Sequence, residues 1–235
     1  ARRGRARLPP ALDLPERERH PERAAAVAAK IIDRPVRITL SRAVDMSITG
    51  TRHSFMTSYR AAARVDADRK VHFEAFDAEL FNNAGSAFDL SGPVLCRALL
   101  HIDGCYNWPN FRAVGQVCKT AQPPHTAFRG FGGPQGIAAC EHVIDQLALA
   151  CDVPGDQIRR DNMYKDGEST PFGMVIGTPD GGKWNVPKMW DDLSQRIDIL
   201  SRREANQIFN AKNKWKKRGI GFVPTKFGIA FTEKR

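Results

Sequence analysis

The sequence lacks three features that would place it in specialised classes of protein. No run approaches the roughly 18 consecutive apolar residues of a membrane-spanning helix. No Ser or Thr occurs in the first 38 residues, which disfavours a Ser-rich transit peptide, and no apolar stretch of a secretory signal is present. We therefore expect a globular protein of the cytoplasm, with peroxisomes as the alternative, and no membrane partner.

Cysteines are few and never form a CxxC pair. The five are scattered along the chain: Cys96, Cys105, Cys118, Cys140 and Cys151. An odd number without paired spacing argues against a disulfide framework and against a zinc or iron–sulfur site within this chain. We interpret them as free thiols in a reducing compartment.

Positive charge is in excess, with a net charge of +10. The excess lies in residues 2–7 and 212–218, where Trp215 is the only aromatic side chain. A nucleic-acid site that works by stacking interleaves aromatic and basic residues. We therefore interpret the two segments as solvated surfaces, or as surfaces that meet another part of a larger protein, and expect no nucleic-acid partner.

The pattern of the chain predicts an α+β (mixed α/β) fold. Residues 1–18 carry Arg, Pro and Leu without periodicity and are expected to be disordered or unrelated to the rest, whereas 19–235 form one partial domain. Strands are predicted at 36–41, 57–65, 71–75, 111–119 and within 219–232. Helices are predicted at 21–32, 93–103, from Pro134 to Cys151, and at 154–164, 186–200 and 201–214.

A glycine-rich segment feeds the helix that contains Pro134. Residues 128–133 read FRGFGG, with an arginine and two phenylalanines among the glycines. Such a loop lets backbone amides approach a ligand closely, and a helix N-terminus favours negative charge. The segment fits neither GxxxxGK[ST] nor GxGxxG. From the residues alone, an anion-binding loop and a tight turn remain equally open.

The longer segment TAFRGFGGPQ at 126–135 resembles the signature of the molybdenum-containing hydroxylases, the xanthine dehydrogenase and aldehyde oxidase family. Further stretches resemble the same family in the same order, so that the resemblance covers roughly residues 20–232. They are RPVRITLSRAVDMSITGTRH (34–53), RALLHIDGCYNWPN (97–110), VCKT (117–120), IRRDNMYKDGE (158–168), NKWKKRG (213–219) and PTKFGIAFT (224–232). The resemblance implies part of a molybdopterin-binding domain, with 2Fe-2S clusters and FAD bound outside this chain.

The resemblance also implies which residues contact the cofactor. The backbone of Ala127, Phe128 and Arg129, with Gly130, would lie against the molybdenum centre and its pterin. The metal would have no side-chain ligand from this chain, and the backbone of Arg129 would be its nearest contact.

Two phenylalanines are implied as substrate contacts. Phe131 would stack on a purine ring, and Phe231 would meet the same ring edge-on, with Thr232 alongside. One stacked and one edge-on ring would hold a planar heterocycle in a fixed orientation. Without the resemblance, both phenylalanines read as core residues.

Arg97 is implied as a catalytic and substrate-binding residue. Xanthine dehydrogenases carry an arginine here that donates to a purine carbonyl and stabilises charge on the ring, whereas aldehyde oxidases carry an apolar residue. Arg97 therefore favours purines, and the alternative is an ordinary helix-surface arginine. Cys96 departs from the glutamate that usually precedes this arginine.

Other family motifs are not present in this sequence. The active-site glutamate in a GLGE segment and a purine-binding glutamate in an FGGKE segment have no counterpart here. The sequence thus predicts a fragment of a xanthine dehydrogenase-type enzyme, inactive alone, whose parent is a homodimer that passes electrons to NAD, with oxygen as the alternative acceptor, since that choice belongs to a flavin domain outside this chain. An aldehyde oxidase fragment and a non-catalytic remnant are the alternatives.

Overall fold

The computed structural model describes residues 20–177 and 182–228. The N-terminal segment 1–18, for which disorder is predicted, lies outside the described residues. The elements in chain order are α1 (His20–Ile32), α2 (Arg42–Ile48), β1 (Phe55–Val65), β2 (Val71–Gly85), α3 (Ser91–Leu99), β3 (Asn110–Lys119), α4 (Gly133–Cys151), α5 (Gly155–Asp161), α6 (Val186–Arg196) and α7 (Ile199–Lys212). Within these ranges, no helix combines the length and apolar character needed to cross a bilayer.

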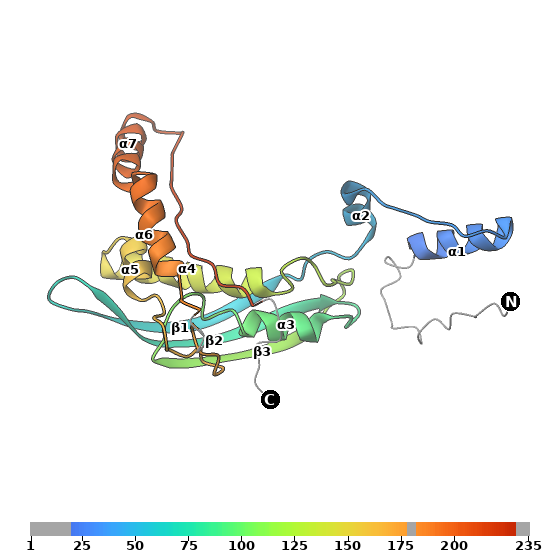
Figure 1. Ribbon diagram of the computed structural model, residues 1–235, viewed down its shortest axis with the longest axis horizontal. Coiled ribbons are helices and arrows are strands. Elements are labelled where there is room, and N and C mark those ends of the chain that lie inside the picture. Colours follow the sequence, from blue (N-terminus) through green and yellow to red (C-terminus); the bar gives the residue numbers. More distant parts are fainter. Residues whose placement is uncertain (1–19, 178–181, 229–235) are drawn as a thin grey trace. The chain divides into compact units, whose positions relative to one another are not determined.

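The three strands form one mixed sheet in the order β1-β2-β3 (Figure 1). β1 and β2 are joined by a tight turn in which Arg69 has a positive φ of 60°. β3 follows α3 and runs parallel to β2, because Asn110 Nδ2 donates to the Glu74 carbonyl near one end and Thr120 N to the Gly85 carbonyl at the other. A helix is the usual connection between parallel strands. The α+β prediction is thus confirmed.

Most predicted elements are present, but the strand predicted at 36–41 is wrong. Residues 36–41 are not a strand; Ser41 instead caps the start of α2, its side chain accepting a hydrogen bond from the Val44 backbone amide. Of the strand predicted within 219–232, residues 219–228 form no strand, and residues 229–232 lie outside the described residues. An alternating pattern reports strand preference, but a strand also needs a neighbour for its backbone groups.

The alternation of buried and more exposed side chains shifts by one residue part-way along β2. Val71 and Phe73 are buried, but the next buried side chain is Phe76, whereas strict alternation would bury Ala75. From Phe76 onward every second residue is buried up to Ala84. The strand therefore presents one alternation in its first residues and the shifted one in the remainder.

The described residues divide into two compact units, each of which draws on all three strands. The first unit contains 20–56, 80–97 and 115–132; the second contains 57–79, 98–114 and 133–228 without 178–181. In the first unit, Leu80, Val94 and Leu95 are buried apolar residues. Gly115 of β3 lies against Leu95, since a Cβ there would be 2.6 Å from Leu95 Cδ1.

A buried histidine belongs to the first unit. His53 is 2% exposed, and its Nε2 lies 2.7 Å from Ser91 Oγ at the start of α3. The side-chain amide nitrogen of Asn82 donates to the Ser91 carbonyl at 2.7 Å. Burial and the neighbouring His125 lower the pKa of His53 to about 4. The imidazole is therefore neutral at neutral pH.

The second unit has an aromatic core. The rings of Phe73 and Trp108 stack with centroids 3.9 Å apart and planes 5° apart, and Phe76 packs beside Trp108. α4 meets the end of α3 at a glycine: a Cβ on Gly136 would lie 2.3 Å from the Ala98 carbonyl oxygen. α4 can approach that closely only without a side chain at this position.

We predict that Gly136→Ala destabilises the protein. Alanine favours a helix more than glycine does, but the added methyl group would overlap a backbone carbonyl that cannot turn away. The expected loss in the free energy of unfolding is about 1–3 kcal/mol, measured by urea denaturation. Gly221→Ala is the control, since a Cβ there meets nothing within 4 Å. Equal stability of both variants would contradict the close approach.

We also predict that His53 makes stability fall as the pH is lowered. Between about pH 6.5 and pH 4 the unfolded chain binds a proton that the folded chain rejects, so stability present at neutral pH is lost as the pH falls through this window. The shift corresponds to at most about 3 kcal/mol. His53→Gln can still contact Ser91 but cannot titrate, and its stability should depend less steeply on pH. Parallel pH profiles of the two proteins would contradict the assignment.

Candidate functional site

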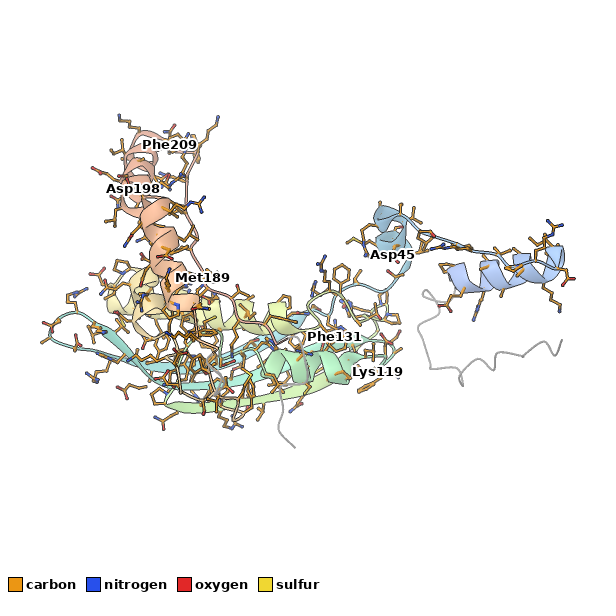
Figure 2. All side chains as sticks on the ribbon, viewed as in Figure 1. Asp45, Lys119, Phe131, Met189, Asp198 and Phe209 are labelled. Carbon is orange, nitrogen blue, oxygen red and sulfur yellow. The ribbon has the colours of Figure 1, made fainter. Side chains whose placement is uncertain are left out.

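The glycine-rich loop turns the chain sharply before α4. Gly130, Phe131 and Gly132 have φ angles of 90°, 50° and 97°, so three consecutive residues adopt the left-handed region. The Phe131 amide donates to the Phe128 carbonyl at 2.7 Å. Phe131 is half-buried and lies in the connection between Lys119, the last residue of β3, and α4 (Figure 2). A phenylalanine in this conformation is held against its own preference.

Residues 51 and 52 hold the loop in place. The Thr126 amide donates to the Thr51 carbonyl at 3.0 Å, and Thr51 Oγ1 lies 2.9 Å from His125 Nδ1. Arg52 Nη2 donates to the Arg129 carbonyl at 2.6 Å. The Arg52 guanidinium also lies over the Phe128 ring, 4.6 Å from its centroid. Both ends of the stretch 125–129 are thereby fixed.

Two buried nitrogens beside the loop lack partners in the described part of the chain. They are Nη1 of Arg52 and Nε2 of His125. A buried donor that bonds to nothing is costly, so such groups mark places where a further partner is expected. Arg52 and the exposed Arg129 bring positive charge to this place. The loop is therefore suited to an anionic ligand.

The structure brings the described candidate residues into one unit. Arg97 stands half-buried in the last turn of α3, and residues 127–131 form the loop, all within the first unit. Phe231 and Thr232 lie outside the described residues. Among residues 20–177 and 182–228, no group of three His, Cys, Asp or Glu side chains is placed to hold a metal ion.

The sequence reasoning assigned no role to Thr51, Arg52 or His125. Thr51 and Arg52 stand in the TGTRH run just before β1, within a stretch whose resemblance to the family was noted. His125 directly precedes the TAFRGF segment. An arginine far from the loop in sequence gives no local signal that it will bond to a loop carbonyl, so only the fold reveals the pairing.

The loop lies within a region that matches a known protein family. The family described as "Molybdopterin cofactor-binding domain" matches residues 17–163, which contain Arg97 and the whole loop. The chain is 43% identical over 209 residues to a xanthine dehydrogenase/oxidase of Felis catus, covering 89% of this chain and 15% of that protein. It is 40% identical over 206 residues to a nicotinate hydroxylase of Emericella nidulans, covering 88% of this chain and 15% of that protein.

A solved structure shares the fold. The aldehyde oxidoreductase of Desulfovibrio gigas superposes with a TM-score of 0.63 and 27% identity, over 77% of this chain and 19% of that one. The chain thus spans about 15% of the length of the curated relatives that it matches. The family match covers more than half of the residues and includes the loop. The chain therefore belongs to the molybdopterin cofactor-binding domain family.

Proposed function

We propose that this chain forms part of the cofactor and substrate site of a xanthine dehydrogenase-type hydroxylase that converts hypoxanthine and xanthine to urate. The observation that carries the proposal is the loop 126–132, which is strained, contains glycines at 130 and 132, and is flanked by a guanidinium nitrogen of Arg52 that has no partner among the described residues. In the whole enzyme, 2Fe-2S clusters and FAD would lie outside this chain and pass electrons to NAD. The enzyme would be a cytoplasmic homodimer.

The residues present fit a molybdopterin. Such a pterin carries a phosphate and sulfur ligands that are negatively charged, and Arg52 offers a buried nitrogen without a partner among the described residues. The glycines at 130 and 132 leave the backbone free of side chains where a flat ligand would approach. Ala127, Phe128, Arg129 and Gly130 would hold the group through their backbone, with Arg129 nearest the metal.

The bound cofactor would supply the two-electron oxidation of a ring carbon. The residues of this chain would position the substrate beside it. Phe131 would stack on the heterocycle, with Phe231 and Thr232 as further contacts, and its left-handed backbone would fix the direction of its ring. A ring fixed in this way presents one carbon to the reacting centre.

Arg97 would select the purine. Its guanidinium would donate to a carbonyl oxygen of the ring and stabilise negative charge that develops there during hydroxylation. Oxidation of an aldehyde is the second candidate, because the solved relative is an aldehyde oxidoreductase. An aldehyde has no ring carbonyl for this arginine, so the two candidates differ at Arg97.

The test is a chimaera in which the matched 209 residues of the cat xanthine dehydrogenase/oxidase are replaced by those of this chain. Xanthine, nicotinate and a simple aldehyde are compared as substrates. The proposal expects turnover of xanthine with molybdenum bound. A chimaera that binds molybdenum and oxidises only nicotinate or the aldehyde would overturn the substrate assignment.

We predict that Arg97→Met in this chimaera lowers kcat/KM for xanthine by about 10- to 100-fold, because a hydrogen bond to a charged group contributes about 1.5–3 kcal/mol. Aldehyde oxidation should change little. Arg60→Met is the control, since Arg60 is exposed and pairs only with Asp77 among described residues. An equal loss with both substrates would argue against a selective role for Arg97.

We predict that Phe131→Ala raises the KM for xanthine by about tenfold, because stacking of an aromatic side chain on a base contributes about 1–3 kcal/mol. Phe88→Ala removes an exposed phenylalanine of the same unit and should leave the KM unchanged. Steady-state kinetics give the KM for xanthine of the chimaera, of its Phe131→Ala variant and of its Phe88→Ala variant. Unchanged kinetics in Phe131→Ala would remove the stacking role.

A further inference from the structure

Positive charge gathers at the end of α7 and just after it, in the second unit. From residue 205 to residue 228 the sequence has no Asp or Glu but six cations, of which five lie within 212–218, called here the basic segment. They are Lys212, Lys214, Lys216, Lys217 and Arg218. The sixth, Lys226, is buried and donates to Asp103 Oδ2 at 2.6 Å. The buried cation thus has a carboxylate partner.

The five cations of the basic segment have no such partner. All five are exposed, and within the described ranges none forms an ion pair with a carboxylate. Other cations on helices of the second unit are paired, Arg160 with Asp191 and Arg203 with Asp156, each at 2.7 Å. Like charges placed so close together repel one another, and a surface of opposite charge relieves that repulsion. The basic segment is therefore complementary to a negatively charged surface.

The basic segment is fixed to α7, although it forms no helix or strand beyond Lys212. The side chain of Asn210 donates to the Arg218 carbonyl at 2.9 Å and accepts from the Arg218 amide at 2.7 Å, and its carbonyl accepts from Lys217 Nζ at 2.7 Å. The Arg218 guanidinium lies 3.8 Å from the centre of the ring of Phe209 in α7 (Figure 2). A segment that is already ordered loses less conformational entropy when it binds a partner.

The middle of the basic segment presents a tryptophan. Trp215 is 87% exposed, and the Lys214 ammonium lies over its ring, 4.7 Å from the centroid. By contrast, Trp108 and Trp190 are buried, at 4% and 7% exposed. Tryptophan and arginine are among the residues that most often dominate the binding energy of protein interfaces. An ordered, exposed tryptophan among unpaired cations is typical of a binding surface and not of a solvated face.

The segment fits a protein surface better than a nucleic acid or a lipid surface. Nucleic-acid binding by stacking needs several aromatic side chains, and a helix that lies in a membrane interface needs a long apolar face. The basic segment offers only Trp215 for either purpose. A protein surface is close at hand, because this chain covers 15% of the cat xanthine dehydrogenase/oxidase. Surfaces tethered on one polypeptide meet at an effective concentration of about millimolar.

We propose that the basic segment is an interdomain docking surface, which binds a carboxylate-bearing surface of the part of the parent hydroxylase that lies outside this chain. Trp215 is buried at the middle of the contact, and the surrounding cations pair with the carboxylates. The proposal rests on that part of the proposed function which makes this chain a piece of a larger hydroxylase. It does not depend on which substrate the enzyme oxidises.

The proposal is tested by hydroxyl-radical footprinting of the chimaera, built to carry residues 20–228 of this chain. The rate of oxidation follows exposure, so that exposed fractions of 87% and 7% make an uncovered Trp215 react about tenfold faster than Trp190. In the chimaera Trp215 should react as slowly as Trp190, because the partner surface covers it. A Trp215 that still reacts about tenfold faster than Trp190 would overturn the proposal.

The role of charge is tested in the chimaera by Lys214→Glu combined with Lys216→Glu. Neither lysine pairs with a carboxylate among the described residues, so the unit should stay folded. Carboxylates would then face carboxylates across the contact, and oxidation of Trp215 should rise at least about fivefold. The control is Arg23→Glu with Lys30→Glu, which alters two exposed cations of α1 and changes the net charge equally. Equal protection of Trp215 in both double variants would overturn the pairing with carboxylates.

Two further readouts separate the alternatives. If Trp215 reacts rapidly in the chimaera and the full chain sediments with phosphatidylserine vesicles but not with phosphatidylcholine vesicles, a lipid surface is the partner and the proposal is overturned. Xanthine turnover is measured on the same chimaera. A chimaera that protects Trp215 but does not oxidise xanthine would count against the proposed substrate and support the docking surface.

Discussion

The candidate site depends on one backbone constraint, the reversal of the chain at residues 130–132. Glycines at 130 and 132 adopt positive φ freely, but Phe131 does so at a cost of about 1–2 kcal/mol. That conformation persists because the surrounding contacts impose it, chiefly the bonds from Thr51 and Arg52 to the preceding residues.

α4 lies in the second unit and is placed by several close contacts. It begins directly after the reversal, receives Phe227 at Gly133, and approaches the end of α3 at Gly136. Farther along, Glu141 accepts hydrogen bonds from Tyr106 at 2.7 Å and from Arg159 at 2.7 Å, which ties the helix to α5. Small residues near the beginning of the helix allow close packing there, and charged residues farther along fix its position. Within the second unit, the helix thus packs against Phe227, the end of α3 and α5.

Much of this could be predicted from the sequence, for physical reasons. The hairpin, α1 and the helices after the loop were predicted from the spacing of apolar residues and from Gly and Pro near the ends of the elements. Residues 36–41 and 219–228 have a strand-like pattern, but no neighbouring strand among the described residues pairs with them. The shift in which side chains of β2 are buried, between Phe73 and Phe76, could not be predicted either, because an alternating pattern carries no information on local twist.

The candidate site, too, was predicted from the sequence only in part. The FRGF loop and Arg97 were identified by resemblance, and their roles remain proposals. Arg52 and the Asp103–Lys226 pair were not predicted, since each joins residues more than 70 positions apart. Sequence spacing reports neighbours along a helix or strand, whereas these pairings exist only after the elements have packed.

The most direct test of the account is a crystal structure of the chimaera with a purine bound. The account predicts the backbone of residues 127–130 beside the molybdenum, the Phe131 ring parallel to the purine, and Arg97 within hydrogen-bonding distance of a ring carbonyl. A purine bound in the same crystal at a place remote from residues 126–131 would contradict it.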